Sequence, residues 1–323
     1  MPLLSALAFS IQSYGFLGSG AEGPSFQFLM IAGGGAGGGH AGAGGGAGGY
    51  RSSIFEDAYS GASSTIESAI PIETGKAYVI SVGAGGTGSG NSPGGNGSIS
   101  RINNSSAGGS TDINSVGGGG GNGGPPSAAG AAGGSGGGHG THGAPNGTSP
   151  FQGGAGTAEQ GTDGGQAGPA TSPGPGAVYN SGGGGGAGTT AKFKGAPFWT
   201  GPATHAKVNG GNGLFSSATG TSVERAGGGG GSSQQASGNG MGGSGGGGSP
   251  LNAPSGSSAG TVNTGSGGGG IHAGPDSAGG TGGKGVVIIR ATAEAASTSG
   301  SPTASTDGAF FVYIFNSDGS ITF

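Results

Sequence analysis

The chain has no cysteine, and only 7% of its 323 residues are charged. Without cysteine it can form neither disulfides nor thiolate metal sites. With a net charge of −4 it has no basic stripe, so we expect no binding to nucleic acid. No stretch approaches the roughly 18 consecutive apolar residues of a membrane span, so we expect no membrane insertion.

What the chain has in excess is glycine, at 94 positions, in runs such as 117–121, 182–186, 227–231 and 245–248. Glycine loses more backbone freedom on folding than any other residue, by roughly 0.5 to 1 kcal/mol relative to alanine. A Pro and Gly content this high without a period is typical of low-complexity chains. Composition alone therefore favours disorder.

Strand-like segments at both ends of the glycine argue against disorder. Residues 26–32, 77–82 and 285–290 are short, rich in β-branched or aromatic residues, and bounded by glycine, which is typical of strands. Residues 310–315 and 320–323, joined by a turn with Asp318-Gly319, predict a hairpin. We therefore predict an irregular, all-β fold, with a small β base that gathers both ends of a long glycine-rich insertion and with exposed loops.

Polyglycine II geometry offers the glycine runs an ordered state without a hydrophobic core. It has three residues per turn and a rise of about 3.1 Å per residue, and its backbone donors and acceptors point outward. Helices without side chains can pack almost backbone to backbone, so that each N–H meets a neighbour's carbonyl. The Gly-X-Y period of collagen is missing. We therefore predict a bundle of packed polyglycine II helices within one chain.

Four segments carry a resemblance to a known family. They are residues 28–35 (FLMIAGGG), 44–51 (GGGAGGYR), 79–86 (VISVGAGG) and 285–290 (GVVIIR). Their order and spacing over residues 26–293 resemble the glycine-rich modules of bacteriophage tail-fibre and receptor-binding proteins, common in phages of aquatic bacteria. The resemblance implies a fibre-tip adhesin whose polyglycine II helices pack as a sandwich and display loops to the host surface. In that family the carboxyl-terminal strand pair usually precedes such a module, so here it either completes the β base or begins a second module.

We divide the chain into residues 1–25, a virion-attachment segment; 26–293, the polyglycine II module with its β bookends; and 294–323, a Ser/Thr linker and β-hairpin. The first part lacks the basic n-region of a signal peptide, so we interpret it as a peptide that docks onto an upstream fibre or tail protein, with a homotrimer as one option. The candidate assembly residues are Leu3, Leu4, Leu7, Phe9, Ile11, Tyr14 and Phe16.

Residues 189–226 are the longest break in the glycine pattern and contain the single tryptophan. Exposed aromatic rings suit sugar rings or protein loops, and lysines can pair with phosphate or carboxylate. The expected partner is a host envelope polysaccharide or an outer-membrane protein. Equally, Phe198 and Trp199 could form a small core over the glycine helices. The candidate receptor-binding residues are Lys192, Phe193, Lys194, Phe198, Trp199, His205 and Lys207.

Catalytic and metal-binding motifs are weak. Residues 133–137 and 242–246 both match G-x-S-x-G, but neither follows a predicted strand with a helix behind it. His139 and His142 are three residues apart, without a nearby carboxylate or thiolate to complete a metal shell. We therefore predict no enzymatic activity, no cofactor and no metal site.

Three function classes follow from this sequence. The first is a non-enzymatic adhesin or fibre component of a phage virion, present in the host cytoplasm during assembly. The second is a structural virion part, such as a head decoration or tail collar, without a receptor role. The third is an ice-binding or wall-type glycine-rich protein, which a flat threonine array or a short tandem repeat would favour, and the sequence has neither.

Overall fold

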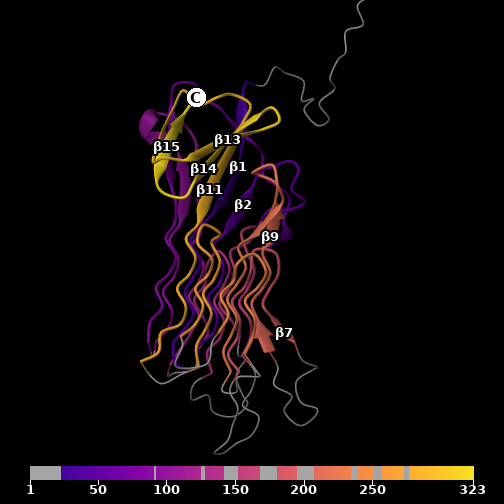
Figure 1. Ribbon diagram of the computed structural model, residues 1–323, viewed down its shortest axis with the longest axis vertical. Coiled ribbons are helices and arrows are strands. Elements are labelled where there is room, and N and C mark those ends of the chain that lie inside the picture. Colours follow the sequence, from indigo (N-terminus) through magenta and orange to yellow (C-terminus); the bar gives the residue numbers. More distant parts are fainter. Residues whose placement is uncertain are drawn as a thin grey trace, which may run out of the picture.

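The computed structural model describes residues 23–90, 92–124, 128–141, 152–167, 180–194, 207–233, 239–250, 256–272 and 276–323. A β-sandwich forms one end of the molecule, and long glycine-rich segments run side by side from it toward the other end (Figure 1). All strand pairs are antiparallel, and the helices of the described part are two single turns, η1 (Gly61–Ser63) and η2 (Ser105–Ala107). The all-β prediction is confirmed.

The first sheet of the sandwich joins the two ends of the glycine-rich region. Its order is β13-β14-β11-β1-β2, with β3 also beside β1. The strands are β1 (Ser25–Ile31), β2 (Tyr50–Ser52), β3 (Ile70–Pro71), β11 (Val286–Ala291), β13 (Thr303–Asp307) and β14 (Phe310–Phe315). β1 enters the first glycine run and β11 leaves the last one, and they pair from Phe26↔Ala291 to Ile31↔Val286. The first exit of the chain from the sandwich and its last return therefore lie side by side.

The second sheet has the order β12-β15-β4-β5-β6. Its strands are β4 (Ala77–Ser81), β5 (Ser100–Asn103), β6 (Asp112–Ser115), β12 (Ser297–Ser299) and β15 (Gly319–Thr322). Two further ribbons lie outside both sheets: β7 (Lys192–Lys194) pairs with β8 (Lys207–Asn209), and β9 (Leu214–Ser216) pairs with β10 (Val223–Arg225).

The central strands of the first sheet, β1 and β11, are buried on both faces. Phe26, Phe28 and Met30 of β1 lie in the core between the two sheets, whereas Leu29 and Ile31 lie in a second core on the other face. A strand buried on both faces reads as a continuous apolar run, and residues 28–32 show such a run without polar alternation. The core between the sheets includes an aromatic group, with ring centroids 5.1 Å apart for Phe26 and Tyr78 and 5.8 Å apart for Phe26 and Phe323.

The predicted carboxyl-terminal hairpin is wrong. Its two halves are strands, but β14 pairs with β11 and β13, and β15 pairs with β4 and β12. The connection crosses from one sheet to the other, and the Asp318 carboxylate there accepts a 2.8 Å hydrogen bond from the Val82 amide. Phe315 and Ile321 thus enter the same core from opposite sheets. The predicted linker also contains strands, β12 and β13.

The glycine-rich segments between residues 32 and 285, which we call the glycine array, bond to one another with a three-residue period. The amides of Gly33, Ala36 and Gly39 donate to the carbonyls of Ser98, Gly95 and Ser92, those of Gly34 and Gly37 to Gly283 and Gly280, and those of Gly35 and Gly38 to Gly46 and Ala43. The partner segment therefore changes at each residue and returns after three. A β-strand alternates with a period of two, so these segments are not sheet strands.

At many glycine positions of the array the neighbouring segments approach so closely that a side chain would not fit. A Cβ atom built on Gly33 would lie 1.9 Å from the carbonyl oxygen of Ala84, and one on Gly184 would lie 1.9 Å from that of Gly45. These obstacles are backbone atoms, which cannot rotate away as a flexible side chain can. The glycine content is therefore a packing requirement of the array.

Candidate functional site

Hydroxyl groups fasten the segments of the array together at its distal end, by which we mean the end away from the sandwich. The Ser181 hydroxyl lies 2.9 Å from that of Thr141 and donates to the Ala41 carbonyl at 2.6 Å. The Ser232 hydroxyl donates to the Gly42 carbonyl at 2.7 Å. All three hydroxyl-bearing residues are buried. Burial also lowers the pKa of the nearby His139, so its imidazole is neutral at physiological pH.

A ribbon beside the distal part of the array carries four of the predicted receptor-binding residues (Figure 1). Lys192, Phe193 and Lys194 form β7, and Lys207 begins β8. In the register, Lys194 is opposite Lys207 and Phe193 is opposite Val208. The fold thus brings three lysines, separated by up to 15 positions in the chain, into one two-stranded ribbon, which we call the lysine ribbon.

The remaining predicted residues lie outside the described part of the chain. This applies to three receptor-binding candidates, Phe198, Trp199 and His205. It also applies to all the assembly candidates, which are Leu3, Leu4, Leu7, Phe9, Ile11, Tyr14 and Phe16. Their roles stay predictions.

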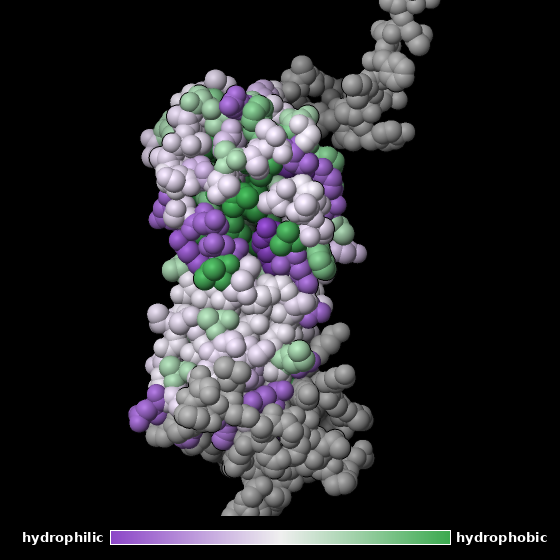
Figure 2. Space-filling view, in the orientation of Figure 1, coloured by the Kyte–Doolittle hydropathy of each residue, from purple (hydrophilic) through white to green (hydrophobic). Residues whose placement is uncertain are grey.

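The surface of the array itself offers little side-chain chemistry. In the face that Figure 2 shows, the array is mostly pale, with neither strongly hydrophilic nor strongly hydrophobic residues, and the strongly coloured side chains gather nearer the sandwich. On this face, the side chains that a ligand could recognise lie mainly near the sandwich.

Three exposed aromatic residues lie near the sandwich. Phe55, Tyr59 and Phe215 are 55%, 51% and 60% exposed, whereas every other aromatic side chain whose burial the structure describes is buried or half-buried. Asp57 joins their two loops, because its carboxylate accepts from the Ser52 hydroxyl at 2.8 Å and from the Ser217 amide at 2.9 Å. We call these three residues the aromatic surface.

Buried polar groups lie behind the aromatic surface. Burial, and then the charge of Asp57, raises the pKa of Tyr50 above its ordinary value, so the phenol stays neutral. Burial lowers the pKa of the Arg225 guanidinium. The nearby Tyr50 and Asp57 act in the opposite direction and raise it. The Tyr50 hydroxyl lies 3.5 Å from the Phe215 carbonyl, so this layer contacts the backbone of one of the exposed aromatic residues.

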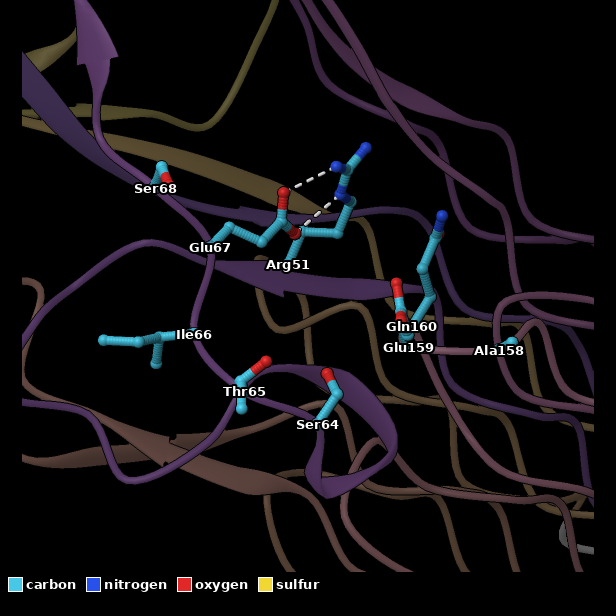
Figure 3. Close-up of a pocket in the computed structure, with 9 residues that line it drawn as sticks. All are labelled: Arg51, Ser64, Thr65, Ile66, Glu67, Ser68, Ala158, Glu159 and Gln160. Atoms are coloured by element: carbon cyan, nitrogen blue, oxygen red, sulfur yellow. Dashed lines mark hydrogen bonds and ion pairs between the residues drawn. The ribbon is translucent and has the colours of Figure 1, made fainter.

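A cavity of about 410 Å³ lies beside β2 (Figure 3). Its walls are Arg51, the loop of residues 64–68 that follows η1, and the turn of residues 158–160. Arg51 donates from Nε to Glu67 at 2.8 Å and from Nη1 to the Asn114 carbonyl at 2.9 Å. The sequence did not indicate this cavity, because its walls are about 100 positions apart in the chain.

Two negative findings apply to the described residues. No three of their histidine, aspartate and glutamate side chains are grouped so that they could hold a metal ion. None of their helices has the length and apolar character needed to cross a bilayer.

A β-sandwich at one end of an array of hydrogen-bonded glycine segments is the architecture of a glycine-rich domain. The chain belongs to the glycine-rich domain family, whose model matches residues 19–292. The match ends just after β11, so β12 to β15 lie beyond it. Comparison with the curated proteins gave no match.

Proposed function

We propose that the chain is a non-enzymatic phage virion protein, a tail-fibre or fibre-tip adhesin that recognises the bacterial surface through the distal end of a polyglycine II scaffold. The observation that carries this proposal is the three-residue period of hydrogen bonds in the array. Polyglycine II has three residues per turn, so successive amides point in three directions and the fourth repeats the first. The bonds of residues 33–39 follow this rule.

The receptor role is supported by the placement of chemistry along the molecule. The array consists mostly of glycine, so we assign specificity to the segments that break the glycine pattern. The lysine ribbon lies beside the distal part of the array. Lysine is a residue type that pairs with the phosphate or carboxylate groups of an envelope polysaccharide. An outer-membrane protein is the other partner class that a segment with several aromatic residues and lysines would suit.

Substitutions in residues 189–226 test the receptor role. Lys192→Ser with Lys194→Ser, and separately Phe198→Ala with Trp199→Ala, should weaken adsorption of virions to host cells. Loss of an anchor costs on the order of 2 kcal/mol, well over tenfold in affinity. Lys284→Ser, beside the sandwich, is the charge control and should leave adsorption unchanged. Unchanged adsorption of stable particles carrying either double substitution would exclude this segment, and a lower Tm for the aromatic pair alone would favour its role as a small core.

A second candidate function, a structural virion part without a receptor role, is favoured by the aromatic surface. Phe55, Tyr59 and Phe215 are more than half exposed, and Asp57 holds their two loops together near the sandwich rather than at the distal end. Exposed aromatic rings are enriched at protein interfaces. Phe55→Ser with Phe215→Ser should then leave a folded protein that is incorporated poorly into particles. Imaging virions with a label on this chain separates the two functions, because an adhesin lies at a fibre tip and a decoration protein lies on the particle shell.

The attachment role of the amino-terminal segment can be tested by truncation. The deletion should stop at residue 22, because the Pro24 carbonyl accepts from Ile72 and Ser25 pairs with Pro71. We expect the shortened chain to fold and to fail to join particles. Normal incorporation would contradict an attachment role for residues 1–22.

A further inference from the structure

We propose that the cavity beside β2 is a binding site for a saccharide unit that is uncharged or carries an amine. This goes beyond the proposed receptor role, because the cavity is near the sandwich and shares no residue with the lysine ribbon. Its volume of about 410 Å³ falls within the usual range of small-molecule sites, about 300 to 1,000 Å³.

Backbone and side-chain hydrogen bonds hold the walls of the cavity in place. The loop wall is fixed where the Glu67 amide donates to the Ser52 carbonyl at 2.8 Å. The turn wall is fixed by Gln160, whose amide donates to the Thr157 carbonyl and whose side-chain oxygen accepts from the Val116 amide at 2.8 Å. A site built this way orders little on binding, so little affinity is lost to that cost.

The lining offers hydrogen bonds that the protein does not use. The hydroxyls of Ser64, Thr65 and Ser68 and the carboxylate of Glu159 have no partner among the described residues. Hydroxyls both donate and accept, and a carboxylate accepts from two neighbouring hydroxyls or from an amine. The hydroxyl groups of a sugar ring match this set.

The charge of the lining selects the kind of sugar. Glu67 is paired with Arg51, which leaves the Glu159 carboxylate as an uncompensated negative charge. An acidic sugar would bring a like charge beside it, whereas an amine would bring an opposite one. The site therefore favours neutral and amino sugars, in contrast to the lysine ribbon, which suits anionic groups.

The backbone supports a ligand role for Glu159. Its φ is 61°, in the left-handed region that glycine adopts freely and glutamate does not. The chain has glycine at 94 positions, yet it keeps an exposed glutamate here, with Ala62 and Ser63 also left-handed, at φ of 54° and 56°, just before the loop wall. No bond within the described part offsets this strain at Glu159. A strained backbone conformation that no contact within the protein stabilises is typical of a functional position.

Saturation-transfer NMR on the purified full-length chain tests the proposal, with glucosamine, glucose and glucuronate as probes. We expect transfer to glucosamine and glucose, and at least tenfold weaker binding of glucuronate. Glu159→Gly should lower affinity for the first two at least tenfold and also raise Tm, because glycine relieves the left-handed strain. Glu159→Gln should lose affinity for glucosamine without the gain in Tm.

Glu294→Gln, an exposed carboxylate outside the cavity, is the matched control and should bind as the wild type does. Absence of transfer to glucose and glucosamine in the wild type would overturn the proposal. Binding that survives Glu159→Gly, or that falls equally in Glu294→Gln, would overturn it as well. None of these results depends on virion adsorption. The receptor role of the distal end is therefore tested separately, by the adsorption of the lysine and aromatic variants.

Discussion

At the scale of single residues, glycine is required in the array for lack of space and elsewhere for its backbone angle. We expect Gly184→Ala to destabilise the protein by about 3 kcal/mol or more, because its Cβ would overlap the Gly45 carbonyl. Gly108→Ala should cost about 1 kcal/mol, since its φ is 73° but no atom lies within 4 Å. Gly23→Ala, with open space around it, is the control and should be close to neutral. Chemical denaturation measures all three, and equal effects would contradict the close packing.

Glu73 gives the protein a pH dependence on the acid side. Hydrogen bonds from Asn104, and then from Lys76, lower the pKa of Glu73 from 4.5 to about 2. The Asn104 amide lies 2.8 Å from Oε1 and the Lys76 ammonium lies 3.0 Å from Oε2. A carboxylate whose pKa is lowered by folding stabilises the fold above its unfolded pKa and loses this effect as the pH falls through the folded pKa.

We therefore expect the free energy of unfolding to decrease between about pH 4.5 and pH 2, in part through Glu73. Glu73→Gln should flatten this part of the profile, because its amide does not titrate. Glu294→Gln, at an exposed position, should leave the profile unchanged. Parallel acid profiles for the wild type and Glu73→Gln would show that the Asn104 and Lys76 contacts do not act on the carboxylate.

At the scale of elements, Arg290 of β11 connects three parts of the sandwich. Its Nη1 pairs with Glu56 at 2.6 Å and its Nη2 with Asp307 of β13 at 2.8 Å, and its guanidinium lies 4.0 Å from the centre of the Phe310 ring. The Arg290 side chain is only 6% exposed. Removing one partner of a buried ion pair leaves the other charges uncompensated.

We expect Arg290→Ala to lower the free energy of unfolding by about 3 kcal/mol, at the low end for a buried pair because both carboxylates are about a third exposed. Arg101→Ala is the matched control. Its pair with Asp112 is 40% and 48% exposed, so the loss should be less than about 1 kcal/mol. Urea denaturation of both variants measures these losses. An equal loss of unfolding free energy in the two variants would contradict a special role for the buried Arg290 ion pairs.

At the scale of the whole molecule, the array should behave as an ordered body although it buries few side chains. The amides of Gly182, Gly184 and Gly185 donate to His139, Gly229 and Gly136, all in other segments of the array. We therefore expect amide hydrogen exchange of residues 182–186 and 265–270 to be slow, approaching that of β1 and β11. The same peptides in the unfolded chain give the reference rate. Exchange at that rate in the native protein would contradict the packed array.

The sequence predicted the elements whose signal is local. Residues 26–32, 77–82 and 285–290 are strands because β-branched and aromatic residues favour an extended, buried backbone wherever they occur. It also placed Lys192, Lys194 and Lys207 in one candidate segment, though not as opposite strands of a ribbon. It gave no sign that the Ser257 hydroxyl would lie 2.8 and 2.9 Å from the Gly269 and Gly270 carbonyls.

The cavity could not be predicted because its chemistry is assembled from distant parts. Arg51, Glu67 and Glu159 are ordinary charged residues in the sequence, and only folding places them around one space. The left-handed backbone of Glu159 is likewise invisible in the sequence, where a non-glycine residue gives no sign of a positive φ.

The sequence by itself determined that this protein would be held together by backbone, because a chain with 94 glycines and few charges has little else to pack. It also determined that a β base would bring the ends of the array together. Only the tertiary structure decided which segment bonds to which, and which sheet receives β14 and β15. The physical reason is that glycine has no side chain to distinguish one neighbour from another, so each segment's partners follow from where the sandwich and the turns place it.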